Sequence, residues 1–433
     1  MSQQREIQPI ARFKASLRLP GSKSLTNRAL LLGAMARGVT VLSDPLWADD
    51  TLRMYEALRE LGVKIKGKPG DKQLEITGLD GFSHQEALTL DLGNSGISIR
   101  TLAAACTLGI GRYRLDGDAR MKQRPIGELV EAMRKLGAVV RYDGPQGYPP
   151  IIVEGNQPQG GRLSMKPTLS SQYITALLQV GPYFRRGLTL KFEGAITSRP
   201  YVEMTLRLMQ KFGVRVQVSA DWSEIQVPCG GYQATPYAIE PDASNGSYFL
   251  AAAAILPGSS CTLEGLGKAS LQGDVGFADV LHRMGADLVF GNDFVTIMSP
   301  TGGTKLQGIE IDLNDMPDMA QTLAVTALFA QGPTTIRNVG NLRVKETDRL
   351  AALQTELRKF GAKADIDGDD LRIEPAEEIK VPAEGVDTYN DHRMAMSFTV
   401  AGLKVPGVKI NDPGCVGKTF PGFFEYVDKL GKF

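Results

Sequence analysis

The chain of 433 residues is poor in the side chains that build metal sites and disulfide frameworks. Its four cysteines form no CxxC pair, and its three histidines lack a metal-ligand spacing such as HExxH. These patterns argue against a disulfide framework and against a structural zinc site. We therefore expect no metal site. The cysteines and histidines are Cys106, Cys229, Cys261, Cys415, His84, His282 and His392.

The chain also lacks an excess of one charge and any long apolar run. It carries 49 Lys and Arg against 48 Asp and Glu, so no global field attracts nucleic acid or acidic membranes. The opening MSQQREIQPI has no apolar signal core, and the longest apolar run, YFLAAAAIL at 248–256, is too short to span a bilayer. We expect a cytoplasmic protein that binds neither nucleic acid nor membranes, and we expect it to be a monomer.

One sequence phrase recurs through the chain: a helical stretch ends at a glycine and a strand-like stretch follows, as in ALRELGVKI and AMRKLGAVVRY. The recurrences lie roughly 70 to 76 residues apart, and a fixed period of this length indicates a repeated supersecondary unit. A glycine at this place can take the left-handed conformation that ends a helix. The six glycines are Gly62, Gly137, Gly213, Gly285, Gly361 and Gly431.

A second kind of helix recurs between these phrases, apolar nearly all round, as in YFLAAAAILPG and LAVTALFAQG. Such helices should be buried, whereas the first kind, as in GELVEAMRKLG, is amphipathic and should face solvent. Six units of one buried helix, one exposed helix and several strands predict an α/β fold in two domains of three units. The Gly- and Pro-rich stretch 228–246 marks the boundary, which places residues 1–20 and 241–433 in one domain and 21–240 in the other.

Cations stand where helices begin, although a helix N-terminus carries partial positive charge and favours Asp or Glu. In LPGSKSLTNRALLLGA, Lys23 and Arg28 flank the start of a helix for which Thr26 or Asn27 is the candidate cap. Equivalent positions of a repeat tend to point the same way, so these cations and helix N-termini predict an anion site. The alternative is solvated surface charge. The further cations are Arg100, Arg124, Arg199, Lys345, Arg349, Arg393 and Lys418.

Ten motifs of the chain resemble one family, the bacterial 5-enolpyruvylshikimate-3-phosphate synthases, over nearly its whole length. They are LPGSKSLTNRALLLGA, GNSGISIR, RMKQRPIGELV, SSQYITALL, SRPYVEMTL, PDASNGSYFLAAAAI, MPDMAQTLAV, RVKETDRL, TYNDHRMAMSF and GKTFPGFF. The resemblance implies two domains, each of three βαβαββ units around buried helices (an inside-out α/β barrel), with the active site in the cleft between the domains. It also implies transfer of the enolpyruvyl group of phosphoenolpyruvate to the 5-hydroxyl of shikimate 3-phosphate. Phosphate leaves through a tetrahedral intermediate, and no cofactor takes part.

The resemblance also implies roles for individual residues. Asp318 is the expected base on the 5-hydroxyl, and Glu346 is the expected proton donor and acceptor at C3 of phosphoenolpyruvate. Lys23 is the expected catalytic cation that contacts both substrates. The expected phosphoenolpyruvate ligands are Lys23, Gly96, Arg124, Gln172, Arg349, Arg393 and Lys418. The expected shikimate 3-phosphate ligands are Lys23, Ser24, Arg28, Ser170, Ser171, Gln172, Ser198, Tyr201, Asp318, Asn341 and Lys345.

Structural roles compete with several of these assignments. Asp318 can instead be a helix cap, and Glu346 can pair with Arg349 or Arg343 on a helix surface. The two serines of SSQYITALL can be ordinary polar residues ahead of a buried helix. His392 is expected to be a packed structural histidine and not a catalyst.

Two other functions stay open beside the resemblance. The carboxyvinyltransferase that acts on UDP-N-acetylglucosamine shares the fold, but it has a cysteine before its RP motif, where this chain reads DGDARMKQRP. A non-catalytic repeat protein that binds a phosphorylated ligand would need no acids at Asp318 and Glu346. A nucleotide P-loop is excluded, because the residues before Lys23 read LRLPGS and lack the first glycine of G-x-x-x-x-G-K-[ST].

The chain departs from the resembled pattern G-N-[AS]-G-T-x-x-R-P at Ile97 and Thr101. Ile97 is bulkier than threonine and makes no side-chain hydrogen bond, and Thr101 restores a backbone N–H that proline lacks. We expect these two changes to shift Gly96 slightly into the phosphoenolpyruvate pocket. Such a shift predicts tolerance of glyphosate, the inhibitor of the family that occupies this pocket and is longer than phosphoenolpyruvate.

We also expect the domains to be open without ligand and to close when shikimate 3-phosphate neutralises the facing cations.

Overall fold

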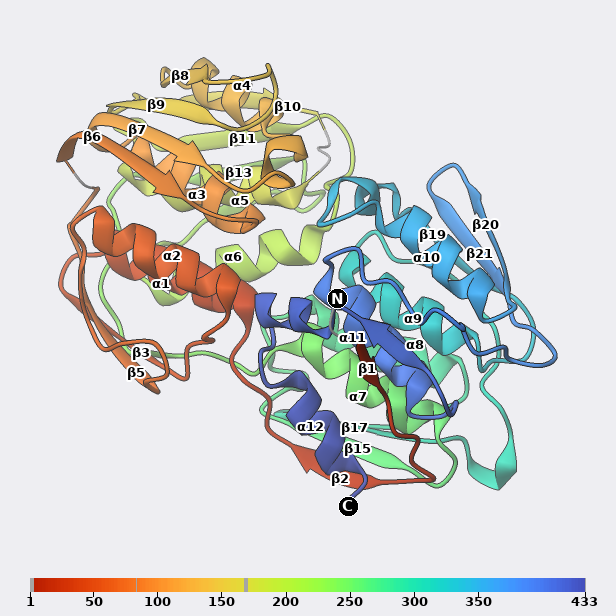
Figure 1. Cartoon of the computed structure of the whole chain (residues 1–433). Coiled ribbons are helices and arrows are strands. Elements are labelled where there is room, and N and C mark those ends of the chain that lie inside the picture. Colours follow the sequence, from red (N-terminus) through yellow and green to blue (C-terminus); the bar gives the residue numbers. More distant parts are fainter. Residues whose placement is uncertain (1–3, 83, 167–169, 433) are drawn as a thin grey trace. The chain divides into compact units, whose positions relative to one another are not determined.

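The computed structural model describes residues 4–82, 84–166 and 170–432. The chain divides into two compact units (Figure 1). Unit 1 comprises Met1–Pro20 together with Glu240–Phe433, and unit 2 comprises Gly21–Ile239. These bounds differ by one residue from those expected from the sequence.

The first strands of the chain belong to unit 1 although they precede unit 2 in the sequence. Strand β2 (Lys14–Leu17) pairs in parallel with β15 (Ser260–Glu264) of unit 1. Conversely, β14 (Tyr237–Ala238), at the end of unit 2, pairs in parallel with β3 (Val39–Ser43) near its start. Each unit is therefore closed by a strand that is distant in sequence from the strand it pairs with.

Unit 2 contains three four-stranded sheets with one pattern of strand directions. In each sheet the first two strands pair in parallel and the next two join antiparallel. The sequence phrase that recurs roughly every 70 to 76 residues thus corresponds to a repeated arrangement of strands. Across the sheets the strands are β14, β3, β5 (Gln73–Thr77) and β4 (Lys64–Lys66); β6 (His84–Asp91), β7 (Ile110–Asp116), β9 (Ile151–Asn156) and β8 (Val139–Tyr142); and β10 (Gly161–Met165), β11 (Leu188–Phe192), β13 (Glu224–Val227) and β12 (Gln217–Val218).

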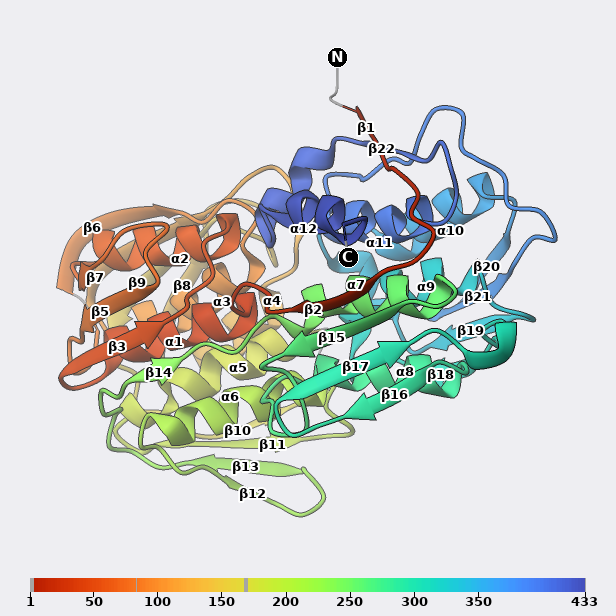
Figure 2. The same ribbon diagram turned by 90° about the horizontal axis from the view of Figure 1, so that it is seen from below.

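Unit 1 repeats this pattern in two sheets, one of which is seen with its strands side by side in Figure 2. The place of a third sheet is taken by the antiparallel pair β1 (Gln4–Glu6) and β22 (Lys409–Asn411), with an isolated parallel bridge between Val386 and Ile410. The four-stranded sheets are β2, β15, β17 (Phe294–Met298) and β16 (Asp287–Phe290), and β18 (Glu310–Asp312), β19 (Thr334–Arg337), β21 (Asp370–Glu374) and β20 (Lys363–Asp367).

The helices that are apolar nearly all round are buried, as their sequences predict. In unit 1 the helices α7, α9 and α11 pack on one another, and in unit 2 the helix α3 packs on α1 and α5. Every residue of α3, α9 and α11 is buried. The buried helices are α1 (Lys23–Met35), α3 (Gly96–Cys106), α5 (Ser171–Val180), α7 (Ala243–Ile255), α9 (Ala320–Ala327) and α11 (His392–Gly402).

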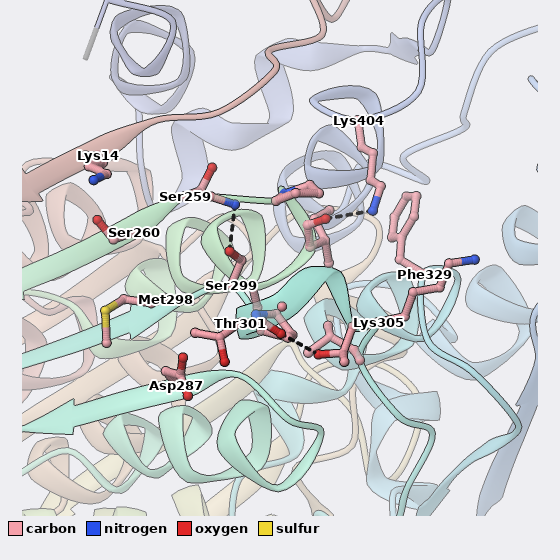
Figure 3. Close-up of a pocket in the computed structure, with 18 residues that line it drawn as sticks. Lys14, Ser259, Ser260, Asp287, Met298, Ser299, Thr301, Lys305, Phe329 and Lys404 are labelled. Atoms are coloured by element: carbon pink, nitrogen blue, oxygen red, sulfur yellow. Dashed lines mark hydrogen bonds between the residues drawn. The ribbon is translucent and has the colours of Figure 1, made fainter.

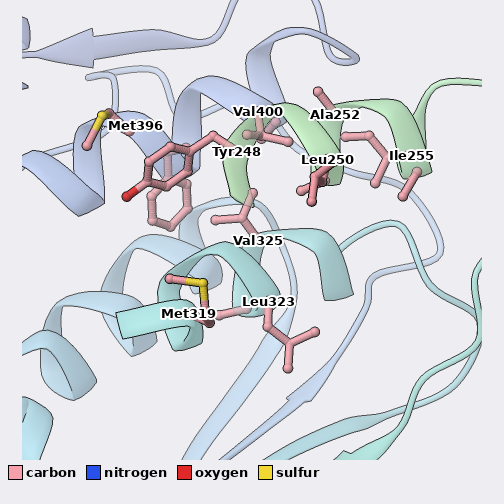
Figure 4. Close-up of a cluster of buried hydrophobic side chains, with 14 of the residues drawn as sticks. Tyr248, Leu250, Ala252, Ile255, Met319, Leu323, Val325, Met396 and Val400 are labelled. Carbon is pink, nitrogen blue, oxygen red and sulfur yellow. The ribbon is translucent and has the colours of Figure 1, made fainter. Parts of the chain in front are cut away.

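Figure 4 shows how the buried helices of unit 1 form its core. Tyr248 and Leu250 of α7 lie in this core with Leu323 of α9 and Val400 of α11. Full burial of a side chain of this size contributes about 1.5–3 kcal/mol. Small alanines at 251–254 leave α7 room to pack against both partners. This core fixes the directions of the helices whose N-terminal ends carry the polar groups described below.

The amphipathic helices keep one side exposed, as predicted, and five of the six repeated glycines that follow them have positive φ. Gly431 is the exception, with φ −69°. In the part of the chain that the structure describes, no helix is long and apolar enough to cross a membrane. The amphipathic helices are α2 (Asp49–Glu60), α4 (Gly127–Lys135), α6 (Arg199–Lys211), α8 (Phe277–Arg283), α10 (Arg349–Lys359) and α12 (Phe423–Leu430).

Candidate active site

Helix α10 begins at Arg349, whose side chain is only 1% exposed and contacts three carboxylates. Its Nη1 donates to Asp318 Oδ1 at 3.1 Å, its Nη2 to Glu346 Oε2 at 2.8 Å and its Nε to Asp391 Oδ2 at 2.7 Å. Burial by itself lowers the pKa of Arg349, but the three carboxylates outweigh burial and hold this pKa above its usual value. Arg349 is therefore a charged, fixed centre around which the carboxylates gather.

Arg393, in the first turn of α11, is the second guanidinium at Asp318. Its Nη2 donates to Asp318 Oδ2 at 2.8 Å, and its backbone N donates to the capping carboxylate of Asp391 at 2.9 Å. Its Nη1 lies 3.4 Å from the hydroxyl of Tyr248, a group whose pKa is raised by burial to about 12. Each oxygen of Asp318 thus accepts from a different arginine.

Two lysines complete this group of side chains. Lys345 Nζ lies 4.0 Å from Asp318 Oδ1, and Lys418 Nζ lies 3.9 Å from Glu346 Oε1. Lys345 and Asp318 are about a fifth exposed, so the group opens to solvent at these two residues. Four cations face three carboxylates, and the excess positive charge favours an anionic ligand. We name as the unit 1 cluster the residues Asp318, Lys345, Glu346, Arg349, Asp391, Arg393 and Lys418.

The structure tests the structural alternatives for two of these residues. Asp318 lies in the short 3₁₀ turn Pro317–Met319, and no side chain caps the following helix α9, so the cap assignment is wrong. Glu346 does pair with Arg349, but both side chains are buried, so the pair does not lie on a helix surface. Asn341 lies in the 3₁₀ segment Gly340–Val344, which leads into the cluster.

In unit 2, helix α1 begins earlier than predicted, and the expectation of a cap at Thr26 or Asn27 is wrong. Ser22 has extended backbone angles, and its hydroxyl accepts from Leu25 N, so the helix starts at Lys23. Lys23 Nζ lies 3.3 Å from the buried carboxylate of Asp50 in the first turn of α2. The cation that seemed to flank the helix is its first residue.

Arg28 is buried between α1 and α6. It donates to Thr205 Oγ1 at 2.8 Å, to the carbonyl of Ser24 at 2.9 Å and to the carbonyl of Tyr201 at 3.4 Å. Burial lowers the pKa of Arg28 to about 10. Three of its five N–H groups face the protein in this way, so Arg28 also ties the two helices together.

Gly96 begins helix α3 between two guanidinium groups. A Cβ at Gly96 would lie 2.5 Å from Arg124 Nη2 and 2.9 Å from Arg100 Nη1, so any larger residue here would displace these guanidinium groups. Arg124 Nη1 donates to the carbonyl and side-chain oxygens of Asn94, both at 3.0 Å. Arg100 donates to the side-chain oxygen of Gln172, at the start of α5. The predicted residues Gly96 and Gln172 therefore lie beside a pair of arginines, one of which, Arg124, is itself a predicted residue.

The predicted serines and tyrosine of unit 2 lie at helix starts. Ser170 caps α5, where its Oγ accepts from Gln172 N at 3.3 Å, and the buried Ser171 is the first residue of this helix. Ser198 precedes α6 with a left-handed backbone, φ 55°, and its carbonyl accepts from Tyr201 N at 3.1 Å. We name as the unit 2 cluster the residues Lys23, Ser24, Arg28, Asp50, Asn94, Gly96, Arg100, Arg124, Ser170, Ser171, Gln172, Ser198 and Tyr201.

Sequence reasoning missed the partners of the predicted cations. Asp391 lies within the motif TYNDHRMAMSF, and its place before a helix was a signal for a cap, but nothing local points to Arg349. Asp50 likewise follows Lys23 by 27 residues without a shared motif, and Arg100 was noted only as a cation at a helix start. His392 is fully buried, as predicted for a packed histidine.

The chemistry of both clusters suits anions better than metal ions. Among residues 4–82, 84–166 and 170–432, no group of three His, Cys, Asp or Glu side chains could hold a metal ion. The carboxylates of the unit 1 cluster are instead bound by Arg and Lys side chains, which are natural partners of phosphate and carboxylate groups.

A pocket of about 540 Å³ in unit 1 lies at the other ends of the buried helices (Figure 3). Lys404 lies beside it, and its Nζ donates to the carbonyl of Ile255 at the end of α7 and lies 5.0 Å from the centre of the Phe329 ring. This lysine closes a helix C-terminus, where a cation is favoured for structural reasons. The pocket contains none of the predicted site residues, and we assign it no role in the reaction.

The fold is that of solved enolpyruvyl transferases. The chain is similar to a solved structure of EPSP synthase from Acinetobacter baumannii, with a TM-score of 0.81 and 27% sequence identity, over 100% of this chain and 98% of that one. It shares its fold with the enolpyruvyl transferase NikO from Streptomyces tendae, with a TM-score of 0.77 and 19% identity, over 100% and 98% of the two chains.

Sequence comparison identifies the family. The profile of EPSP synthase (3-phosphoshikimate 1-carboxyvinyltransferase) matches residues 7–427. The chain is 47% identical to the 3-phosphoshikimate 1-carboxyvinyltransferase of Vibrio atlanticus over 98% of both chains. It is 44% identical to that of Shewanella pealeana over 99% of both. The chain belongs to the EPSP synthase family.

Proposed function

We propose that the two clusters divide the work of the reaction that transfers the enolpyruvyl group of phosphoenolpyruvate to the 5-hydroxyl of shikimate 3-phosphate. Arg349, Arg393 and Lys418 of unit 1 bind phosphoenolpyruvate, together with Lys23, Gly96, Arg124 and Gln172 of unit 2. The remaining members of the predicted set bind shikimate 3-phosphate: Ser24, Arg28, Ser170, Ser171, Ser198, Tyr201, Asn341 and Lys345. The enzyme acts in the cytoplasm as a monomer. The observation that carries the proposal is the unit 1 cluster, in which four cations face three carboxylates, two of them the expected proton-transfer groups.

The carboxylates Asp318 and Glu346 move the protons of the reaction. In the addition step Asp318 accepts the proton of the 5-hydroxyl, the oxygen bonds to C2 of phosphoenolpyruvate, and Glu346 gives a proton to C3. In the elimination step phosphate leaves C2 and takes up the proton that Asp318 had accepted, and Glu346 takes a proton back from C3. Both acids return to their starting states, one phosphate is released and one enol ether is formed, so no oxidant or reductant is needed.

Substrate binding itself prepares these acids. Without substrate, Asp318 accepts from Arg349 and Arg393, and Glu346 accepts from Arg349. An anionic substrate that takes over these donors removes cationic stabilisation from the carboxylates, which makes them better proton acceptors. The arginines then bind charge that develops on the departing phosphate.

A phosphate-release assay tests the proposed function. The purified chain should release phosphate only when phosphoenolpyruvate and shikimate 3-phosphate are both present. The acceptor UDP-N-acetylglucosamine, supplied in place of shikimate 3-phosphate, should give no release. Phosphate release from phosphoenolpyruvate with UDP-N-acetylglucosamine, but not with shikimate 3-phosphate, would favour the other carboxyvinyltransferase. Binding of both substrates without any release would favour a non-catalytic protein.

A further inference from the structure

The segment 386–393, which carries two members of the unit 1 cluster, is bound to helix α10 at a second place. Glu356 follows Arg349 by seven residues on α10, a spacing that puts both side chains on one face of the helix, about 10 Å apart along its axis. The Glu356 side chain is fully buried. Its Oε1 accepts from the hydroxyl of Tyr389 at 2.7 Å, and its Oε2 accepts from Asp387 N at 3.1 Å.

Further polar contacts compensate the buried carboxylate of Glu356. Lys359 Nζ lies 2.8 Å from Glu356 Oε2 and donates to Asp387 Oδ2, also at 2.8 Å. Partial burial, together with the facing Glu356, raises the pKa of Tyr389, so its hydroxyl keeps the proton that it donates. A buried carboxylate with three donors is a strong anchor. Loss of Lys359 would leave its charge uncompensated, and loss of either neutral donor would leave a buried charged oxygen with one hydrogen bond fewer.

The anchored segment contains two neighbouring residues in a disfavoured backbone conformation. Tyr389 has φ 55° and Asn390 has φ 54°, both in the left-handed region that residues with a Cβ rarely adopt. Such a conformation persists only where the surrounding structure holds it. The next residue is Asp391, which caps α11 and accepts from Arg349. The strained turn therefore sets the direction of the chain that follows it, and with it the positions of Asp391 and Arg393.

We infer that Glu356 and Tyr389 are positioning residues for the arginines that bind phosphoenolpyruvate, an inference that rests on the proposed function. The pair holds the left-handed turn against α10, and the turn aligns Asp391 with Arg349 and Arg393 with Asp318. Neither residue belongs to the unit 1 cluster, and neither contacts the reacting groups. Loss of the pair loosens the arginines, while most of the proposed shikimate 3-phosphate ligands lie in unit 2 and keep their places.

Steady-state kinetics of Tyr389→Phe test this inference. This variant keeps the ring and removes only the hydroxyl that donates to Glu356. The KM for phosphoenolpyruvate should rise about 3- to 10-fold, the scale of one hydrogen bond to a charged group. The KM for shikimate 3-phosphate and kcat should stay within about twofold, since a positioning role moves one substrate only. Glu356→Gln should act in the same direction.

A matched control and a rescue separate positioning from general destabilisation. Tyr426→Phe also removes one tyrosine hydroxyl of unit 1, which donates to the carbonyl of Arg18 at 3.3 Å, and should leave both KM values unchanged. Asn390→Gly added to Tyr389→Phe should lower the KM for phosphoenolpyruvate again, because glycine adopts the left-handed conformation without strain. If Glu356→Gln fails to fold, Tyr389→Phe and its rescue decide the question.

Three results would overturn the inference. One is a KM for phosphoenolpyruvate in Tyr389→Phe equal to that in Tyr426→Phe. Another is an equal rise of both KM values, which indicates a merely structural role. The third is a wild-type chain that releases no phosphate from the two substrates, in which case the proposed function fails and the inference falls with it. An active wild type with unchanged KM values in the variants refutes the positioning role alone.

Discussion

Replacement of Asp391 by asparagine measures how strongly the unit 1 cluster is held together. Asp391 is fully buried and accepts from Arg349 Nε at 2.7 Å and Nη2 at 3.2 Å. Removal of one partner from a buried ion pair costs about 3–5 kcal/mol. Arg349 keeps Asp318 and Glu346 in the variant, so we expect the lower end, a loss of about 3 kcal/mol in the free energy of unfolding of unit 1.

Alanine at the same position separates the charge from the helix cap. Asparagine keeps a side-chain oxygen that can accept from Arg393 N, whereas alanine does not, and loss of a cap costs about 1 kcal/mol more. Urea unfolding followed by circular dichroism reports both units. The fluorescence of Trp47 and Trp222 reports unit 2 alone, because both tryptophans of the chain lie there. The reasoning would be refuted if Asp391→Asn lowered the free energy of unfolding of unit 1 by less than about 1 kcal/mol. It would also be refuted if Asp391→Ala lowered this free energy no further than Asp391→Asn does.

Three further predictions concern catalysis, inhibition and alkaline stability. Asp318→Ala and Glu346→Gln should each lower kcat by roughly 10² or more while substrate binding changes by less than about tenfold, as stopped-flow or steady-state kinetics can show. Ile97→Thr with Thr101→Pro should make glyphosate inhibition about 10- to 150-fold stronger, equal to about 1.4–3 kcal/mol, in inhibition curves. The pKa of Tyr248 is about 12 in the folded chain against 10 ordinarily, so the unfolded chain loses this proton first and stability falls from pH 10 to 12. Tyr248→Phe should reduce that fall by on the order of 2 kcal/mol in urea unfolding at the two pH values.

Each of these predictions has a result that contradicts it. Near wild-type kcat in Asp318→Ala or Glu346→Gln would remove that residue from the proton transfers. A native enzyme that is already inhibited at low glyphosate concentration, with no greater sensitivity in the double variant, would end the steric argument at Gly96. An unchanged alkaline profile in Tyr248→Phe would assign the loss of stability to other groups.

The sequence could predict the repeat, the buried helices and the presence of cations near helix starts, because each depends on a local pattern. Helix α9 is apolar nearly all round, and such a helix is expected inside a core. Arg393 could be selected because it stands in a specific motif at the start of a helix. In each case the pattern that supports the prediction lies within about one helix length, along the sequence, of the residues that it concerns.

The pairings that give the cations their geometry could not be predicted in this way. Arg349 meets Asp391 across 42 residues and Asp318 across 31, and both contacts depend on how the helices of unit 1 pack. The start of α1 was misplaced because Ser22, with Gly21 before it, offers a cap that competes with Thr26 and Asn27. The resemblance supplied the roles of residues, whereas the structure supplies their partners and distances.

The exchange of hydrogen at C3 of the substrate tests the central claim most directly. The reaction in D₂O with both substrates, followed by mass spectrometry of the product and of recovered phosphoenolpyruvate, reports whether C3 gains and loses a proton. Addition and elimination through Glu346 predict deuterium in the transferred enolpyruvyl group, and its incorporation should slow together with turnover in Glu346→Gln. Product that forms at the wild-type rate without any deuterium would contradict the account.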